Sequence, residues 1–195
     1  MQQLSLSSNA VYILSVNEAS AGKWERVGAE HLFLALCKAS RFERADSEMI
    51  VQQLGKGQGD VDGVQADFGA IKGVFTRASV DPQRTRYALR EVIGKGGFNH
   101  QDSTLHRTDE CRQVYREADR LVKETGSTAV KPIHLLWALA NAADSMPLRY
   151  LRKEGVDVSR LVDICREAAG GKSGAGTSPK EPKESAKTPP AAPKT

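Results

Sequence analysis

Two histidines stand in matching surroundings, and they are the first residues of the sequence that could do chemistry. His31 opens the segment His-Leu-Phe-Leu-Ala-Leu, and His134 opens the similar segment His-Leu-Leu-Trp-Ala-Leu. An imidazole can bind a metal ion or act as a general base, but both roles need a polar partner at a suitable spacing. Neither histidine has an Asp, Cys or His partner at ligand spacing. We therefore expect no catalytic residue and no metal ligand, but two buried imidazoles that bond to backbone groups near helix starts.

A glycine-lysine-serine motif and three cysteines are the other residues with potential chemistry. Gly171-Lys172-Ser173 has the form of the end of a phosphate-binding P-loop, G-x-x-x-x-G-K-[ST]. The first glycine of that loop would have to be residue 166, which is Arg166. We therefore expect no nucleotide site and no cofactor in this chain. The cysteines are odd in number and far apart, which is typical of buried thiols and not of disulfides or zinc sites: Cys37, Cys111 and Cys165.

The positive charge of the chain is concentrated near its C-terminus. The formal net charge is +4, and residues 171–195, with five lysines and two glutamates, contribute +3 of it. The other residues are close to neutral and offer no basic stripe to follow nucleic-acid phosphates. No apolar run approaches the ~20 residues of a membrane helix, and the first residues lack the features of a secretory signal. We expect a cytoplasmic protein that binds neither nucleic acid nor a membrane.

Residues 171–195 also differ from the rest of the chain in composition. They hold five of the eight prolines and no Leu, Ile, Val, Phe, Tyr or Trp. A segment with no apolar side chains to bury cannot offset the entropy cost of becoming ordered. We predict a disordered Lys/Pro/Ser-rich linker, and we expect a further domain beyond it in a parent protein.

The first 170 residues contain an internal repeat. With an offset of 103 residues, residues 27–36 lie over residues 130–139, and five of the ten amino acids are identical. The same offset places Ser5 over Thr108, and both are favourable helix N-caps.

A second block repeats with a different offset. Residues 79–84 lie over residues 155–160 with an offset of 76, which aligns Asp81 with Asp157. The two offsets differ by 27 residues, which is the length of an insertion in the first copy, within about 39–66. The predicted domain organisation is a first repeat at 1–96, a connector at 97–107 and a second repeat at 108–170.

Apolar residues recur at intervals of three and four in both copies, which is typical of helices and not of strands. Asp81 and Asp157 are predicted N-caps, and Pro132 suits the first turn of a helix. The sequence predicts an all-α fold in which the helices of the first copy superpose on those of the second. These are 5–22, 29–38, 68–77 and 83–94 in the first copy, and 108–125, 132–142, 145–153 and 158–169 in the second.

The insertion contains a short amphipathic segment, residues 47–54, followed by a glycine-rich stretch. One interpretation is a surface elaboration that packs on the first repeat. The other is a partner-specific docking surface, since exposed Met49 and Ile50 suit adaptable protein contacts. The sequence leaves both interpretations open.

The doubled pattern resembles the Clp repeat, the amino-terminal repeat of Clp-type AAA+ protein unfoldases. The first copy reads Glu-His-Leu-Phe-Leu-Ala-Leu at 30–36 and Ser-Val-Asp at 79–81, and the second reads Ile-His-Leu-Leu-Trp-Ala-Leu at 133–139 and Gly-Val-Asp at 155–157. The resemblance covers about 5–38, 68–96 and 105–170. The signature positions, to which we assign structural roles, are His31, Leu32, Leu36, Asp81, His134, Leu135, Leu139 and Asp157.

This resemblance implies a pseudo-two-fold bundle of two four-helix repeats, monomeric in isolation. It also implies a linker to a hexameric ATPase ring, so that ATP and magnesium belong to the parent protein. In the family this domain captures adaptor proteins or unfolded and tagged substrates for proteolysis or disaggregation. The insertion departs from the usual repeat, as does Ile133 where the pattern has a glutamate.

Three functional hypotheses follow. The chain is a substrate- or adaptor-docking domain of a Clp-type unfoldase, a stand-alone Clp-repeat protein that binds a Clp protease or unfoldase without ATPase activity, or a helical nucleic-acid regulator. A P-loop encoded downstream of Thr195 would separate the first from the second. A salt titration of DNA binding would test the third.

Glu30 generates a prediction about arginine recognition. The resemblance implies that an acid at this position contributes to binding phosphorylated arginine, and the equivalent residue of the second copy is Ile133. A guanidinium binds best to a carboxylate that accepts paired hydrogen bonds. We expect calorimetry with a phosphoarginine peptide to give one site per chain, lost in Glu30→Ala and retained in Ile133→Ala. Two equivalent sites would contradict this expectation.

Overall fold

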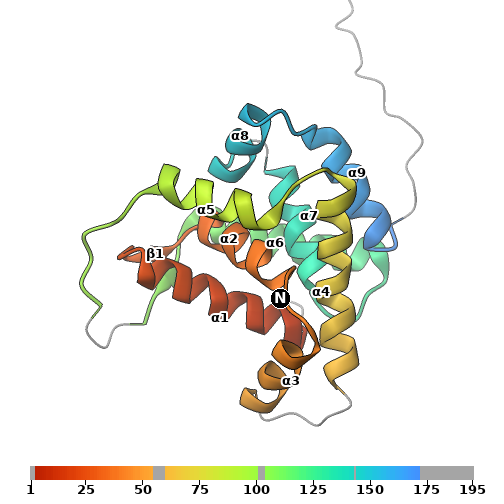
Figure 1. Cartoon of the computed structure of the whole chain (residues 1–195). Helices are drawn as coiled ribbons and strands as arrows, with labels where there is room; N and C mark the ends of the chain where they lie inside the picture. Colours follow the sequence, from red (N-terminus) through yellow and green to blue (C-terminus); the bar gives the residue numbers. More distant parts are fainter. Residues whose placement is uncertain (1–2, 55–59, 101–103, 143, 172–195) are drawn as a thin grey trace, which may run out of the picture.

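The computed structural model describes residues 3–54, 60–100, 104–142 and 144–171, and it confirms the predicted all-α fold. Nine helices pack around one core within these ranges, accompanied by two very short strands (Figure 1). The predicted linker lies outside the described residues, apart from Gly171. The elements are α1 (Leu6–Ala21), β1 (Arg26–Val27), α2 (Ala29–Ala39), α3 (Arg44–Gln53), α4 (Asp60–Arg77), α5 (Pro82–Ile93), β2 (His106–Arg107), α6 (Asp109–Thr125), α7 (Pro132–Asn141), α8 (Met146–Lys153) and α9 (Val158–Ala168).

Side-chain caps begin the first and last helices of each copy. Ser5 and Thr108 each accept a hydrogen bond from the backbone N–H three residues on, at 3.2 and 3.1 Å. Asp81 and Asp157 do the same, both at 3.0 Å. Each cap satisfies an N–H that has no partner within its helix, which stabilises the helix by about 1 kcal/mol. The observed helix starts therefore follow from local side-chain chemistry.

The insertion forms α3 and lengthens α4. The predicted helix at 68–77 begins eight residues earlier, at Asp60. Three glycines in α4 lower its intrinsic helix propensity and concealed this extension from a reading of the sequence alone. Burial of Val61, Val64 and Phe68 at helical spacing outweighs that cost in the folded chain.

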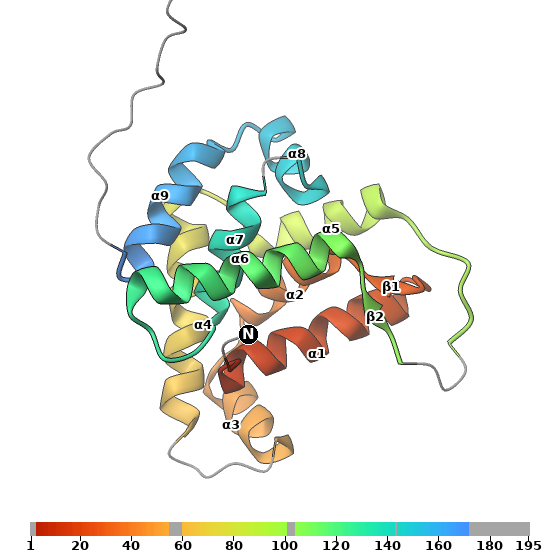
Figure 2. The ribbon, with the colours of Figure 1, turned by 180° about the vertical axis from the view of Figure 1, so that it is seen from behind.

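Two short parallel backbone pairings join the copies, and the sequence did not predict either. Val27 of β1 pairs with Arg107 of β2, and Leu4 forms a bridge with Val130. With the offset of 103 residues, Leu4 corresponds to Arg107 and Val27 to Val130. The two pairings are therefore equivalent under the pseudo-two-fold axis, and each joins the segment before the first helix of one copy to the segment before the second helix of the other. Figure 2 shows the pairing of β1 with β2.

The hydrogen bonds at these pairings are equivalent as well. The backbone N–H of Ser5 donates to the carbonyl of Val130, and that of Thr108 donates to the carbonyl of Val27, both at 2.9 Å. Both valines are almost fully buried. A buried carbonyl without a partner costs about 1–3 kcal/mol. Each copy therefore depends on the other to complete its backbone hydrogen bonding.

An aromatic contact lies close to this junction. Tyr12 of α1 and Tyr115 of α6 are equivalent under the same offset, and their rings meet edge to face with centroids 6.5 Å apart. The guanidinium of Arg107 lies 4.5 Å from the ring centroid of Tyr115 and 5.5 Å from that of Tyr12. These contacts fix the crossing of α1 and α6.

The core is shared by both copies. α2 and α7 lie side by side at its centre, and nearly all their residues are buried (Figure 1). α4 and α8 are matching helices of the two copies, and each contacts the second helix of the other copy. α4 packs on α7, and α8 packs on α2. Neither copy therefore encloses its own central helix alone.

Left-handed backbone conformations recur at equivalent positions, which supports the repeat independently of side chains. Ser79 has φ 56° and its counterpart Gly155 has φ 81°. The same holds for Lys23 and Gly126, at φ 58° and 68°. A side chain in this region costs about 1 kcal/mol or more, because its Cβ crowds the following carbonyl.

We therefore expect Ser79→Gly to stabilise the chain by about 1 kcal/mol. Ser79 is exposed and no hydrogen bond involves its hydroxyl in the described structure, so little is lost with the side chain. Chemical denaturation of the wild type and the variant measures the difference. The matched control, Gly155→Ser, should destabilise by a similar amount, and an unchanged stability in both variants would contradict the expectation.

Candidate functional site

The two repeat histidines occupy equivalent positions inside the fold. Nδ1 of His31 accepts a hydrogen bond from the backbone N–H of Gly28, and Nδ1 of His134 accepts one from that of Lys131, both at 3.0 Å. A neutral ring whose Nδ1 is an acceptor carries its hydrogen on Nε2. Within the described ranges, no group of three or more His, Cys, Asp or Glu side chains could hold a metal ion.

The second ring nitrogen differs between the two histidines. Nε2 of His134 lies 3.1 Å from the Thr125 hydroxyl. Nε2 of His31 is buried and has no hydrogen-bond partner in the described part of the chain. The position equivalent to Thr125 is Gly22, which has no side chain to offer. The copies therefore match in the role of Nδ1 and differ in the surroundings of Nε2.

Glu30 lies at the start of α2, where a negative charge is favourable at the helix N-terminus. Its carboxylate folds back over Gly28, so close that a Cβ on that glycine would come within 2.0 Å of Oε1. Burial raises the pKa of Glu30, its own backbone N–H lowers it, and the nearby carboxylate of Glu110 raises it further. Its counterpart Ile133 is buried.

An apolar groove runs between α1, the end of α2 and the inserted α3. Its volume is about 390 Å³. Met49 of α3 is 51% exposed, as expected, and Ile13 of α1 is 47% exposed. The expectation that Ile50 is exposed was wrong, because this side chain is buried in the core cluster at the groove. The groove brings together the two inserted residues, Met49 and Ile50, with residues of α1 that the sequence analysis missed. Its lining is Ala10, Ile13, Leu14, Asn17, Lys38, Phe42, Met49, Ile50, Gln53 and Leu54.

The inserted helix is held against α4 by polar contacts. Arg44 forms an ion pair with Asp62 at 2.7 Å, and the hydroxyl of Ser47 donates to Oε1 of Gln65 at 2.8 Å. Ser47 is fully buried, so its bond is protected from solvent, whereas the exposed ion pair contributes little. α3 is therefore a fixed wall of the groove.

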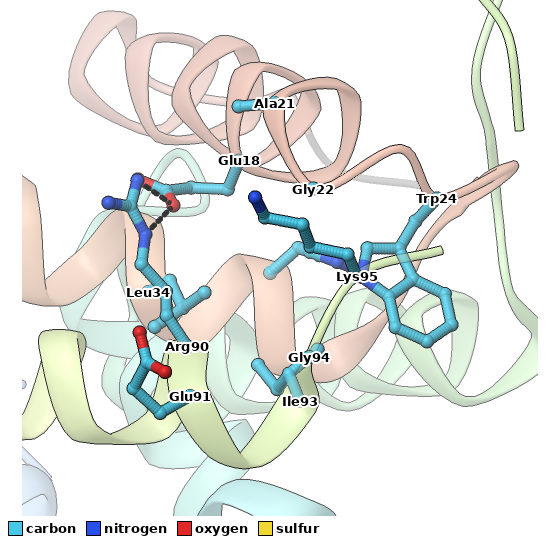
Figure 3. Close-up of a pocket in the computed structure, with 11 residues that line it drawn as sticks. Glu18, Ala21, Gly22, Trp24, Leu34, Arg90, Glu91, Ile93, Gly94 and Lys95 are labelled. Atoms are coloured by element: carbon cyan, nitrogen blue, oxygen red, sulfur yellow. Dashed lines mark hydrogen bonds and ion pairs between the residues drawn. The ribbon is translucent and has the colours of Figure 1, made fainter. Parts of the chain in front are cut away.

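A smaller cavity, of about 300 Å³, lies at the other end of α1 (Figure 3). Its base is Glu18, whose carboxylate accepts paired hydrogen bonds from two guanidinium groups of α5. Arg86 donates to Oε1 at 2.6 and 3.1 Å, and Arg90 donates to Oε2 at 2.5 and 2.8 Å. Two guanidiniums on one carboxylate leave one positive charge beside the cavity.

The sequence carried a weak signal for this cluster. Arg86 and Arg90 are four residues apart and share a face of α5, and both point to the only acidic residue of α1. Nothing in the sequence shows that these helices meet, because 68 residues separate Glu18 from Arg86. Only the packing of α5 beside α1 and α2 brings them together.

Residues 64–154 match the model of the "Clp repeat (R) N-terminal domain" family, beginning within α4. No curated protein sequence matches the chain.

Solved structures resemble the whole fold. The Hsp104 N-terminal domain of Candida albicans is 13% identical, with a TM-score of 0.60 and 88% of this chain and 94% of that chain covered. The N-terminal domain of ClpD from Arabidopsis thaliana is 14% identical, with a TM-score of 0.57 and coverage of 87% and 96%. The N-domain of ClpV from Vibrio cholerae is 14% identical, with a TM-score of 0.55 and coverage of 88% and 87%. At these identities the likeness shows the fold alone.

The buried histidines predict how stability depends on pH. Burial is the main cause that lowers the pKa of both His31 and His134 to about 4, against about 6.5 in an unfolded chain. Between these values the unfolded state binds more protons, so the free energy of unfolding falls as pH falls through this window. We expect each histidine to lower the free energy of unfolding by about 2 kcal/mol when the pH falls from 7 to 5.

Denaturant titrations at the two pH values measure this loss. In His134→Gln the pH-dependent loss should shrink by about 2 kcal/mol, whatever the variant's stability at pH 7. An equal loss in wild type and variant would show that other groups carry the pH dependence.

Proposed function

From the premise that this chain folds as a Clp-type N-terminal domain, we propose that it docks protein partners, either adaptors or unfolded substrates, in the groove between α1 and α3. The observation that carries the proposal is the gathering of exposed apolar side chains at one groove. Among the described residues, four large apolar side chains are well exposed, and two of them, Ile13 and Met49, line it. Exposed apolar side chains that cluster mark interaction sites more often than scattered ones do.

The lining indicates the chemistry of the occupant. Lys38 is its only charged residue, and the remainder is apolar or amide in character. The thioether of Met49 adapts to ligands of different shape. We propose that the occupant is an apolar segment of a protein chain, with one or two large side chains in the groove and an acidic residue beside Lys38.

The docking role is the same whether the chain belongs to an AAA+ unfoldase or acts alone. The groove supports a binding function in both cases. We favour the unfoldase, because the doubled motif resembles the repeat of Clp-type unfoldases and the N-terminal domains of Hsp104, ClpD and ClpV share the fold.

A binding experiment tests the groove. We expect Met49→Asp to weaken the binding of fluorescently labelled, reduced and carboxymethylated lysozyme, a permanently unfolded protein, by about tenfold. The apolar occupant would have to desolvate the introduced charge at the rim, which weakens the complex. Fluorescence anisotropy of the labelled lysozyme measures the binding. Val92→Asp is the matched control, because Val92 is 57% exposed but lies on α5, away from the groove.

Binding through the groove requires the two variants to differ. A loss of similar size in Val92→Asp would indicate nonspecific adhesion to exposed apolar side chains. Full binding by Met49→Asp would place the docking surface elsewhere. Ile13→Asp, on the opposite wall, should reproduce the effect of Met49→Asp.

A further inference from the structure

The cavity at the end of α1 contains two buried N–H groups that lack partners. His31 is 2% exposed and lines the cavity, and its Nε2 has no hydrogen-bond partner in the part of the chain that the structure describes. The same is true of Nε1 of Trp24, which lines the cavity beside it. The two rings are close, with centroids 6.1 Å apart. Buried N–H groups in native proteins nearly always have an acceptor, so a pair without one in the wall of the same cavity points to a ligand.

Both groups can only donate. Nδ1 of His31 accepts from the backbone of Gly28, which leaves the hydrogen of the neutral ring on Nε2. The indole nitrogen of Trp24 is always a donor. Lys95 adds an ammonium group at the exposed rim, where Figure 3 shows its side chain reaching back over the cavity. The cavity therefore offers three donors to a ligand that must supply acceptors.

The second repeat supplies an internal comparison, because there the equivalent imidazole nitrogen has a hydrogen-bond partner. There the Thr125 hydroxyl lies 3.1 Å from Nε2 of His134. Gly22 replaces that threonine in the first repeat. A Cβ on Gly22 would lie 2.8 Å from the Trp24 ring, which is shorter than a normal contact. The indole can therefore occupy its position because residue 22 has no side chain. Among the described residues, the unpartnered Nε2 is thus a feature of the first repeat and not of the shared fold.

Charge selects among the possible acceptors. Glu18 and Glu91 line the cavity, and Oε1 of Glu30 lies 3.3 Å from Nδ1 of His31. With Arg86, Arg90 and Lys95 these groups make three cations and three carboxylates. A cavity without excess positive charge disfavours a dianion such as phosphate, whereas its three donors suit the acceptor oxygens of a monoanion. The volume of about 300 Å³ suits a group of the size of one amino-acid residue.

We propose that this cavity binds a carboxylate, whose oxygens accept hydrogen bonds from the N–H groups of Trp24 and His31 and from the ammonium of Lys95. Two sources share this chemistry: the C-terminal carboxylate of a peptide and an acidic side chain within one. The site is separate from the groove, which lies along the first part of α1, so it stands whether or not the groove binds partners.

The indole N–H signal of Trp24 reports directly on the site. The full chain, labelled with ¹⁵N, is titrated at pH 7 and constant ionic strength with N-acetylglycinate, which mimics a chain terminus. A parallel titration uses N-acetyl-aspartate N-methylamide, which mimics an acidic side chain. We expect a saturable shift of the Trp24 signal with at least one of them, and the tighter ligand identifies the source.

The chain and the ligand both provide controls. The indole N–H of Trp137 is likewise buried and without a partner among the described residues, but Trp137 does not line the cavity, so its signal should stay in place. N-acetylglycinamide, which has the same shape without the charge, should cause no saturable shift. Tighter binding of inorganic phosphate than of either carboxylate would overturn the choice of ligand.

Two variants test the assigned residues. Lys95→Gln removes one exposed charge and should weaken binding about fivefold with an unchanged spectrum of the free protein. Gly22→Thr imports the residue of the second repeat and should abolish binding. The backbone of Gly22 has φ −81°, which any residue adopts, so the variant should fold with an unchanged Trp137 signal. An absent Trp24 shift in the wild type, or binding indifferent to Lys95→Gln, would refute the site.

Discussion

The structure depends on an exchange of backbone hydrogen bonds between its two halves. The segment before α1 bonds to the residue before α7, and the segment before α6 bonds to the residue before α2. Both acceptor carbonyls belong to buried valines, Val27 and Val130. If the two halves separated, these carbonyls would therefore lose their hydrogen-bond partners. The exchange sets where each long helix begins, and the caps at Ser5 and Thr108 follow directly after it. One cooperative unit results, with α2 and α7 at its centre.

The inserted helix α3 occurs in the first half only, and it leaves the exchange of hydrogen bonds between the halves intact. Asp67 of α4 accepts a hydrogen bond from Ser7 at 2.5 Å and pairs with Lys131 at 3.2 Å, so the lengthened helix is tied to the entry segments of both halves. α3 is then free to form one wall of a groove whose other wall is α1. A surface that the second half lacks has thus been added outside the shared core, where extra residues cost little.

The equivalent histidines show how a repeated scaffold acquires different chemistry in its two copies. Both rings cap the entry to a central helix through Nδ1. Around the second nitrogen, one copy has Thr125 as a partner, and the other has a glycine, a tryptophan and the cluster of Glu18 with two arginines. The first interaction is common to both copies, whereas the second differs between them.

Apart from the first eight residues of α4, the sequence by itself determined the main helices, their caps and the two-fold repeat, because these depend on local propensity and on periodic burial of side chains. His31, His134, Asp81 and Asp157 could be placed from their spacing alone, and so could Met49 and Ile50 on an inserted helix. Only the tertiary structure decided the rest. The partners of Val27, Ile13 and Glu18 lie on segments distant in sequence, and no local pattern encodes which helices meet. The groove and the cavity exist because packing brings those segments together, whereas each contributing segment by itself has an ordinary amphipathic pattern.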